Sequence, residues 1–148
     1  MAAHAACPRI VSQSPYITHQ LDWLGLKHCI VGASRYEHTV KVADTGGVLD
    51  PDAAGLAAVK PDLVITSVWT PAEALAAATP PGARALRLTS FQRMTQIEEN
   101  LRQIGQAAGV QDSAARAAAF AHLWRKKAAS IKGGGRRVVL LSSCTGQP

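Results

Sequence analysis

The sequence predicts an α/β fold, a Rossmann-like lobe with a four-stranded parallel sheet. Short apolar runs alternate along the chain with longer segments of helical periodicity, and glycine or proline separates them. Strands that alternate with helices in this way form parallel sheets, because parallel neighbours need a crossover connection. The 148 residues are enough for one such core and a tail.

The predicted strands are short apolar runs rich in β-branched residues. They are Arg9-Ile10-Val11-Ser12, Cys29-Ile30-Val31-Gly32, Leu63-Val64-Ile65 and Ala85-Leu86-Arg87-Leu88. Helices are expected from a Thr18 N-cap to Leu24, from Asp50-Pro51-Asp52 to Lys60, from Pro71 onward, and around the apolar face Met94, Ile97, Leu101 and Ile104. In residues 33–49 the apolar residues show neither helical nor strand periodicity, so this segment is predicted to be a long connection.

A long alanine-rich helix is predicted from Asp112 to Ile131, before a glycine triplet. Its apolar residues are expected to pack against the lobe as a stripe of Ala115, Ala119, Phe120, Leu123 and Trp124. A further strand is expected to begin after the triplet. The predicted organisation is an N-terminal ligand-binding lobe (8–110), a long connecting helix (111–132) and the first strand of a truncated, incomplete second lobe (136–148).

Composition excludes several classes of protein. The net charge of +6 comes from scattered basic residues, so a nucleic-acid surface is not indicated. No apolar run approaches the roughly 18 residues of a membrane helix. The three cysteines are far apart in the sequence and predict neither a disulfide scaffold nor a metal site. The first residues lack a complete secretory signal, so we expect a periplasmic or cell-envelope location if an upstream signal is missing from this sequence, and a cytoplasmic one otherwise.

The candidate binding site lies beyond the carboxyl ends of the strands, where parallel sheets bind ligands. This places Ser14-Pro15, residues 33–36 and residues 67–70 on one rim. Tyr36 and Trp69 suit a large flat ligand, with a loop anchor and a core residue as their respective alternatives. Arg35 suits a carboxylate or phosphate, with a solvated loop arginine as the alternative. His38 is interpreted as a surface histidine, although imidazole also binds iron and cobalt.

Six segments of the sequence resemble, in residue identity and in spacing, the cobalamin and iron-siderophore family of periplasmic solute-binding proteins, which is the helical-backbone class III. They are residues 9–15, 24–26, 31–36, 46–47, 50–52 and 59–65. The resemblance covers residues 9 to about 132. It implies two α/β lobes joined by one long helix, with the ligand between the lobes, and aromatic ligand contacts after the second and third strands at Tyr36 and Trp69. The predicted ligand-binding residues are Ser14, Pro15, Arg35, Tyr36, Gly46, Trp69 and Thr70.

The resemblance implies the N-terminal half of the solute-binding component of an ABC importer for cobalamin, iron-siderophore or haem-type ligands. No catalytic residue, metal-ligating residue or required cofactor is expected, and no Ser-His-Asp, HExxH, P-loop or GxGxxG pattern is present. The implied partners are the importer permease and a small-molecule metal chelate, without nucleic acid. A homodimer through the C-terminal strand is a further expectation.

One departure affects the implied permease contact. Family members often carry an acidic residue on the helix after the Gly-Gly loop, and Ala54 stands at that position here, with Asp50 and Asp52 as substitutes. Two alternatives to the importer component remain open. One is a stand-alone or remnant α/β module that acts as a structural or dimeric binding protein, and the other is a small α/β enzyme.

Overall fold

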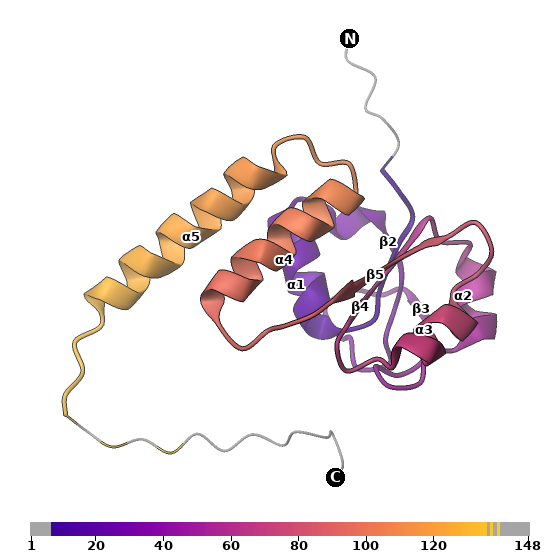
Figure 1. The fold of residues 1–148 in the computed structure, drawn as a ribbon, viewed down its shortest axis with the longest axis horizontal. Helices are drawn as coiled ribbons and strands as arrows, with labels where there is room; N and C mark the ends of the chain where they lie inside the picture. Colours follow the sequence, from indigo (N-terminus) through magenta and orange to yellow (C-terminus); the bar gives the residue numbers. More distant parts are fainter. Residues whose placement is uncertain (1–6, 136, 138, 140–148) are drawn as a thin grey trace.

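The computed structural model describes residues 7–135, 137 and 139, and it confirms the α/β fold with a parallel sheet (Figure 1). The sheet has five strands in the order β3-β2-β1-β4-β5, and every neighbouring pair is parallel. Their bounds are β1 Ile10–Ser12, β2 Ile30–Ala33, β3 Ala43–Asp44, β4 Leu63–Ser67 and β5 Arg84–Leu88.

The prediction of four strands was wrong by one, because β3 was assigned to the long connection. This edge strand has only two residues, and both side chains are exposed. It pairs with β2 through backbone groups, with Gly32 opposite Ala43. A strand that buries no side chain leaves no apolar pattern in the sequence.

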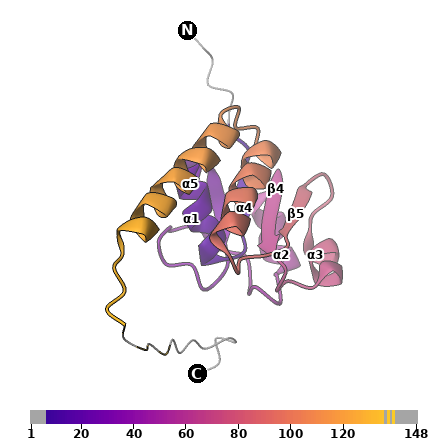
Figure 2. The same cartoon turned by 60° about the vertical axis from the view of Figure 1, so that its left-hand side comes forward.

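Helices cover both faces of the sheet, as Figures 1 and 2 show. On one face the core contains residues of α1 (Pro15–Trp23), α4 (Met94–Ala107) and α5 (Ser113–Ser130). The second face carries α2 (Ala53–Val59) and α3 (Ala72–Ala78). Successive strand residues point to opposite faces, so Ile10 belongs to the first core and Val11 to the second. A short 3₁₀ helix, η1 (Lys27–Cys29), leads into β2.

Two helix starts differ from the prediction. Helix α1 begins at Pro15 rather than after Thr18, since proline fits the first helical position, which needs no backbone donor. Thr18 is buried within the helix, where its hydroxyl is 2.8 Å from the Ser12 hydroxyl. Pro51 precedes α2 instead of lying in its first turn, and Asp52 caps that helix by accepting a hydrogen bond from the Ala54 N–H at 3.0 Å.

The long helix α5 was predicted correctly in extent but not in orientation. Its buried residues are Ala117 and Ala121, whereas Ala115, Ala119 and Leu123 of the predicted stripe are exposed. Alanine occurs on every side of this helix, so its apolar periodicity does not define a face. The orientation is set by Glu98 of α4, whose buried carboxylate accepts hydrogen bonds from Trp124 Nε1 at 2.6 Å and Arg125 Nη2 at 2.9 Å.

No disulfide was indicated by the spacing of the cysteines, but Cys7 and Cys29 form one. They precede β1 and β2, which are parallel neighbours, so a sequence separation of 22 residues becomes a Cα–Cα distance of 5.8 Å. Cys144 lies outside the described residues. So do the predicted strand in 136–148 and the dimer through it, apart from residues 137 and 139, which have no regular structure.

None of the helices described between residues 7 and 135 combines the length and apolar character needed to cross a bilayer.

Candidate functional site

Five connections leave the carboxyl edge of the sheet, one after each parallel strand. Ser14 and Pro15 follow β1, residues 34–37 follow β2, residues 45–52 follow β3, residues 68–70 follow β4 and residues 89–92 follow β5. The predicted rim lies in the connections after β1, β2 and β4, and Gly46 lies in the connection after β3. The connection after β5 was absent from the prediction, although the end of β5 lies at the same edge.

The carboxamide of Gln13, which follows β1, holds the connection after β3 in place. This fully buried side chain donates from Nε2 to the carbonyls of Thr45 at 3.0 Å and Gly47 at 3.1 Å. Thr45 Oγ1 donates back to Gln13 Oε1 at 2.5 Å. The Arg35 N–H donates to the Gly46 carbonyl at 2.9 Å. Gly46 therefore supports the loop that carries Tyr36.

The turn after β4 is fixed from two sides. Arg87 of β5 donates from Nε to the Thr70 carbonyl at 2.9 Å and from Nη2 to the Val68 carbonyl at 2.8 Å. Thr70 is fully buried, and its hydroxyl contacts that of Thr66 and donates to the Val48 carbonyl at 2.5 Å. Thr70 thus positions the turn, and direct contact between its hydroxyl and a ligand stays a prediction. Trp69 projects from this braced turn with 63% of its surface exposed.

A hollow of about 600 Å³ adjoins this edge, between α1, α4, α5 and the turns after β4 and β5. Aromatic side chains dominate its lining. The lining residues are Tyr16, His19, Gln20, Trp23, Val68, Trp69, Thr89, Ser90, Phe91, Gln92, Met94, Ile97, Leu101 and Phe120.

Trp69 is the member of the predicted ligand set that lines this hollow. Tyr36 is half exposed on the neighbouring loop, and Pro15 begins α1 beside Tyr16. The expectation that Pro15, Tyr36 and Trp69 share one hollow is therefore not met. Arg35 Nη2 lies 3.7 Å from Asp50 Oδ2, and both side chains are exposed. Ser14 is buried before α1, and His38 is exposed.

Four aromatic residues of the hollow were not predicted as site residues, although Phe120 was placed in the apolar stripe of the long helix. Tyr16 was assigned to the turn before the helix, although it lies in the first turn of α1. Trp23 and Phe120 meet edge to face with ring centroids 5.5 Å apart, a contact that depends on how α5 packs. Phe91 was detectable in principle, because it directly follows the last strand.

Gln20 supplies an unused polar group in this apolar lining. Its Nε2 donates to the Tyr16 carbonyl at 3.2 Å. Its Oε1 is buried and has no hydrogen-bond partner among the residues that the structure describes. A buried acceptor without a partner is costly, and this atom has almost no accessible surface through which a ligand could reach it.

The carboxylate of Glu37, in the loop after β2, is expected to contribute to the stability of the fold in a pH-dependent way. Burial raises its pKa, but hydrogen bonds to its carboxylate outweigh burial, so the pKa lies below its usual value of 4.5. The clearest of these come from the Thr39 hydroxyl and the Thr39 backbone N–H, each 2.5 Å from Glu37 Oε1. The stabilisation is therefore complete above the unfolded-state pKa and is lost as the pH falls through the lower folded-state pKa. Urea unfolding at pH 7 and at acidic pH measures this effect. Between the two pH values, the free energy of unfolding of Glu37→Gln should fall less than that of the unmodified protein.

Glu73→Gln on α3 is the matched control, because Glu73 is exposed in the described structure. It should retain the acid dependence of the unmodified protein. Equal acid dependence in the Glu37 variant and in the unmodified protein would contradict the role of the Thr39 hydrogen bonds.

Comparison with known proteins supports a specific fold. No protein-family model matches the chain, and no curated protein is significantly similar to it. Solved structures do match. A periplasmic heme-binding protein from Pseudomonas aeruginosa is similar over 82% of this chain and 44% of its own, with a TM-score of 0.72 and 23% identity. The chain has the fold of one lobe of a class III periplasmic binding protein.

Two further structures with this class III lobe agree. The heme-binding protein RhuT from Roseiflexus sp. RS-1 shares 25% identity, with a TM-score of 0.69 over 82% of this chain and 48% of its own. The vitamin B12 binding protein BtuF of Vibrio cholerae shares 20% identity, with a TM-score of 0.68 over 84% of this chain and 52% of its own. The chain thus spans about half the length of the solved structures it matches, and the predicted class III resemblance is confirmed at the level of the fold.

Proposed function

We propose that this chain is the N-terminal half of the solute-binding component of an ABC importer and binds a flat metal chelate of the cobalamin, haem or iron-siderophore type without catalysis. The observation that supports this most is the aromatic hollow at the carboxyl edge of the sheet. Its volume of about 600 Å³ lies within the usual range of small-molecule sites. The chelate is cargo in this proposal, and no cofactor is required.

The lining of the hollow suits one face of a corrin or porphyrin ring. Tyr16, Trp69 and Phe91 offer apolar and aromatic surface from three separate elements. Stacked aromatic groups gain about 0.5–1.5 kcal/mol beyond the burial of their area. His19 and Gln20 of α1 are among the few polar residues of this lining. The site therefore combines a broad apolar wall with few polar groups, as ligand sites of this kind do.

The remaining predicted residues are proposed to form an outer rim. Ser14, Pro15, Arg35, Tyr36 and Gly46 belong to the connections after β1, β2 and β3, next to the turn that carries Trp69. The ion pair between Arg35 and Asp50 is exposed and long, so it contributes little to stability. Arg35 can therefore exchange its partner for a carboxylate or phosphate of the chelate.

The disulfide between Cys7 and Cys29 supports the periplasmic location, because disulfides persist in oxidising compartments. The proposed membrane partner is the importer permease. Asp52 is used as the cap of α2 and Ala54 is exposed, whereas Asp50 retains 72% of its side-chain surface. Asp50 is therefore the better acidic contact for a permease. The homodimer stays a prediction.

A fluorescence titration tests the proposed ligand site. Two of the three tryptophans, Trp23 and Trp69, line the hollow, so adding haem or cobalamin should quench the protein's emission with saturation. Trp69→Ala should weaken binding roughly tenfold or more, as for a central aromatic contact. Leu123→Ala, at an exposed position outside the hollow, is the control and should leave the affinity unchanged.

Two results would oppose this function. An unchanged titration, or equal affinity in the Trp69 and Leu123 variants, would remove the hollow as the binding site. The enzyme alternative is tested separately by assaying ester hydrolysis, which the proposal expects to be absent. Half of a two-lobed site encloses less ligand, so binding weaker than that of a complete two-lobed protein is expected.

A further inference from the structure

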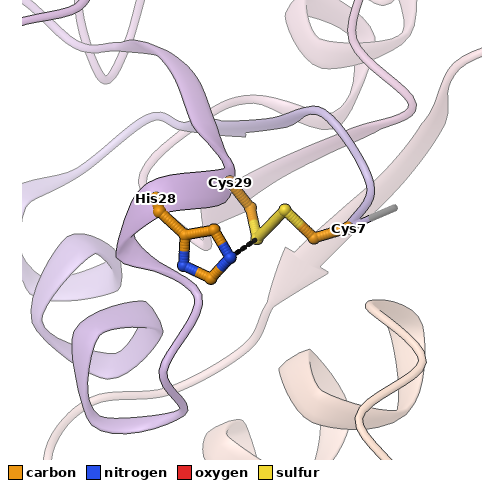
Figure 3. A group of neighbouring side chains, drawn as sticks. All are labelled: Cys7, His28 and Cys29. Atoms are coloured by element: carbon orange, nitrogen blue, oxygen red, sulfur yellow. Dashed lines mark hydrogen bonds between the residues drawn. A yellow bond between two sulfur atoms is a disulfide. The ribbon is translucent and has the colours of Figure 1, made fainter. Parts of the chain in front are cut away.

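Cys7, His28 and Cys29 form a compact cluster of metal-ligating groups at the amino edge of the sheet (Figure 3). Their ligand atoms all lie within 4.8 Å of one another. Cys7 precedes β1, and the other two residues end η1 before β2. The cluster therefore lies at the opposite edge from the aromatic hollow, and its role is separate from the proposed solute binding.

We propose that this cluster is a redox-gated Zn²⁺ site, closed by the disulfide and opened when that bond is reduced. Two thiolates and one imidazole are a ligand set that zinc accepts, with water in the fourth position. Tetrahedral zinc with bonds of about 2.3 Å to sulfur and about 2.0–2.1 Å to nitrogen places these two atoms roughly 3.5 Å apart. His28 Nε2 and Cys29 Sγ are 3.6 Å apart. This pair thus already has the spacing that a shared zinc ion requires.

The two sulfurs have to separate before they can bind a common ion. Two thiolates on tetrahedral zinc lie roughly 3.8 Å apart, which is wider than a disulfide bond. The Cα atoms of Cys7 and Cys29 are 5.8 Å apart, so rotation of the side chains can supply this separation. The disulfide-bonded cysteine pair and the zinc-bound pair of thiolates are therefore mutually exclusive. Oxidation of the pair therefore excludes the metal.

Opening of the site requires a dithiol reductant. Its thiolate attacks Cys7, the less buried of the two cysteines, and the S–S bond breaks with Cys29 leaving as a thiolate beside His28. The second thiol of the reductant then displaces Cys7 and forms a disulfide within the reductant. Two electrons have moved from the reductant to the cysteine pair. Zn²⁺ binds the resulting thiolates and releases any protons that they still carry.

Cobalt absorption tests this site directly. The full chain, with Cys144→Ser in every variant, is reduced with a phosphine, desalted without oxygen and titrated with Co²⁺. Reduced protein should bind one equivalent with a thiolate-to-cobalt charge-transfer band that Zn²⁺ abolishes, and oxidised protein should show no band. His28→Asn should weaken Co²⁺ binding by at least about tenfold. His38→Asn, at an exposed histidine outside the cluster, should bind as the reduced parent does.

Absence of the band from the reduced protein would overturn the proposal. Equal affinity in the His28 and His38 variants would also overturn it, because His28 would then not be a ligand of the ion. His28 is exposed, so its replacement should not prevent folding. The haem titration uses the oxidised protein, and its outcome does not depend on this experiment.

Discussion

Replacing Leu21 with alanine is expected to lower the free energy of unfolding by about 2–5 kcal/mol. Leu21 is fully buried in α1, in the core between the sheet and helices α1, α4 and α5. Truncation removes buried apolar surface and leaves a cavity that a parallel sheet and two packed helices cannot readily close. Urea unfolding followed by circular dichroism measures the change.

Leu123→Ala is the matched control, because it removes the same atoms from a helix. Leu123 lies on α5 with 54% of its surface exposed, so its truncation should change stability by less than about 0.5 kcal/mol. A similar loss in both variants would mean that α5 buries a different face. It would also contradict the packing set by Glu98 and Trp124.

Replacing Gly46 with alanine should cost about 2–5 kcal/mol through backbone strain and overlap together. The φ angle of Gly46 is +94°, a value that residues with a Cβ rarely adopt. An added Cβ would lie 2.4 Å from the Asp52 nitrogen and 2.7 Å from the Asp50 carbonyl oxygen. Both atoms are backbone, so the loop itself has to move. Differential scanning calorimetry or urea unfolding detects the loss.

Gly82→Ala separates strain from overlap. Gly82 has a similar φ of +87°, but an added Cβ would meet no atom within 4 Å. It should lose only the roughly 1–2 kcal/mol of a left-handed conformation, partly offset by the lower entropy of the unfolded chain. Equal losses at both positions would contradict the close approach at Gly46. Because the Gly46 carbonyl accepts the Arg35 N–H, only the Gly46 variant should also alter chelate binding.

The central strands could be predicted because their side chains are buried. Ile10, Leu63 and Ile65 belong to short apolar runs of the sequence, and the structure places all three in the core. Strand β3 could not be predicted, since Ala43 and Asp44 contribute backbone pairing and no buried side chain. Sequence patterns record burial better than they record hydrogen bonding.

The candidate site was predicted only in part, because its wall depends on contacts between distant elements. Trp69 follows β4 and was found from the rule that ligands lie at the carboxyl ends of strands. Phe120 reaches the hollow only because α5 turns Ala117 and Ala121 toward the lobe, and alanine periodicity does not specify that orientation. The Cys7–Cys29 bond likewise depends on the pairing of β1 with β2.

The central claim is that the hollow lined by Tyr16, Trp69 and Phe91 holds a flat metal chelate. Nuclear magnetic resonance of isotope-labelled protein tests it most directly, with cyanocobalamin and zinc protoporphyrin as diamagnetic probes, since it also detects weak binding. We expect amide shift changes in the first turn of α1 and in the connections after β4 and β5. Changes confined to α2 and α3 on the other face, or none with either probe, would contradict the claim.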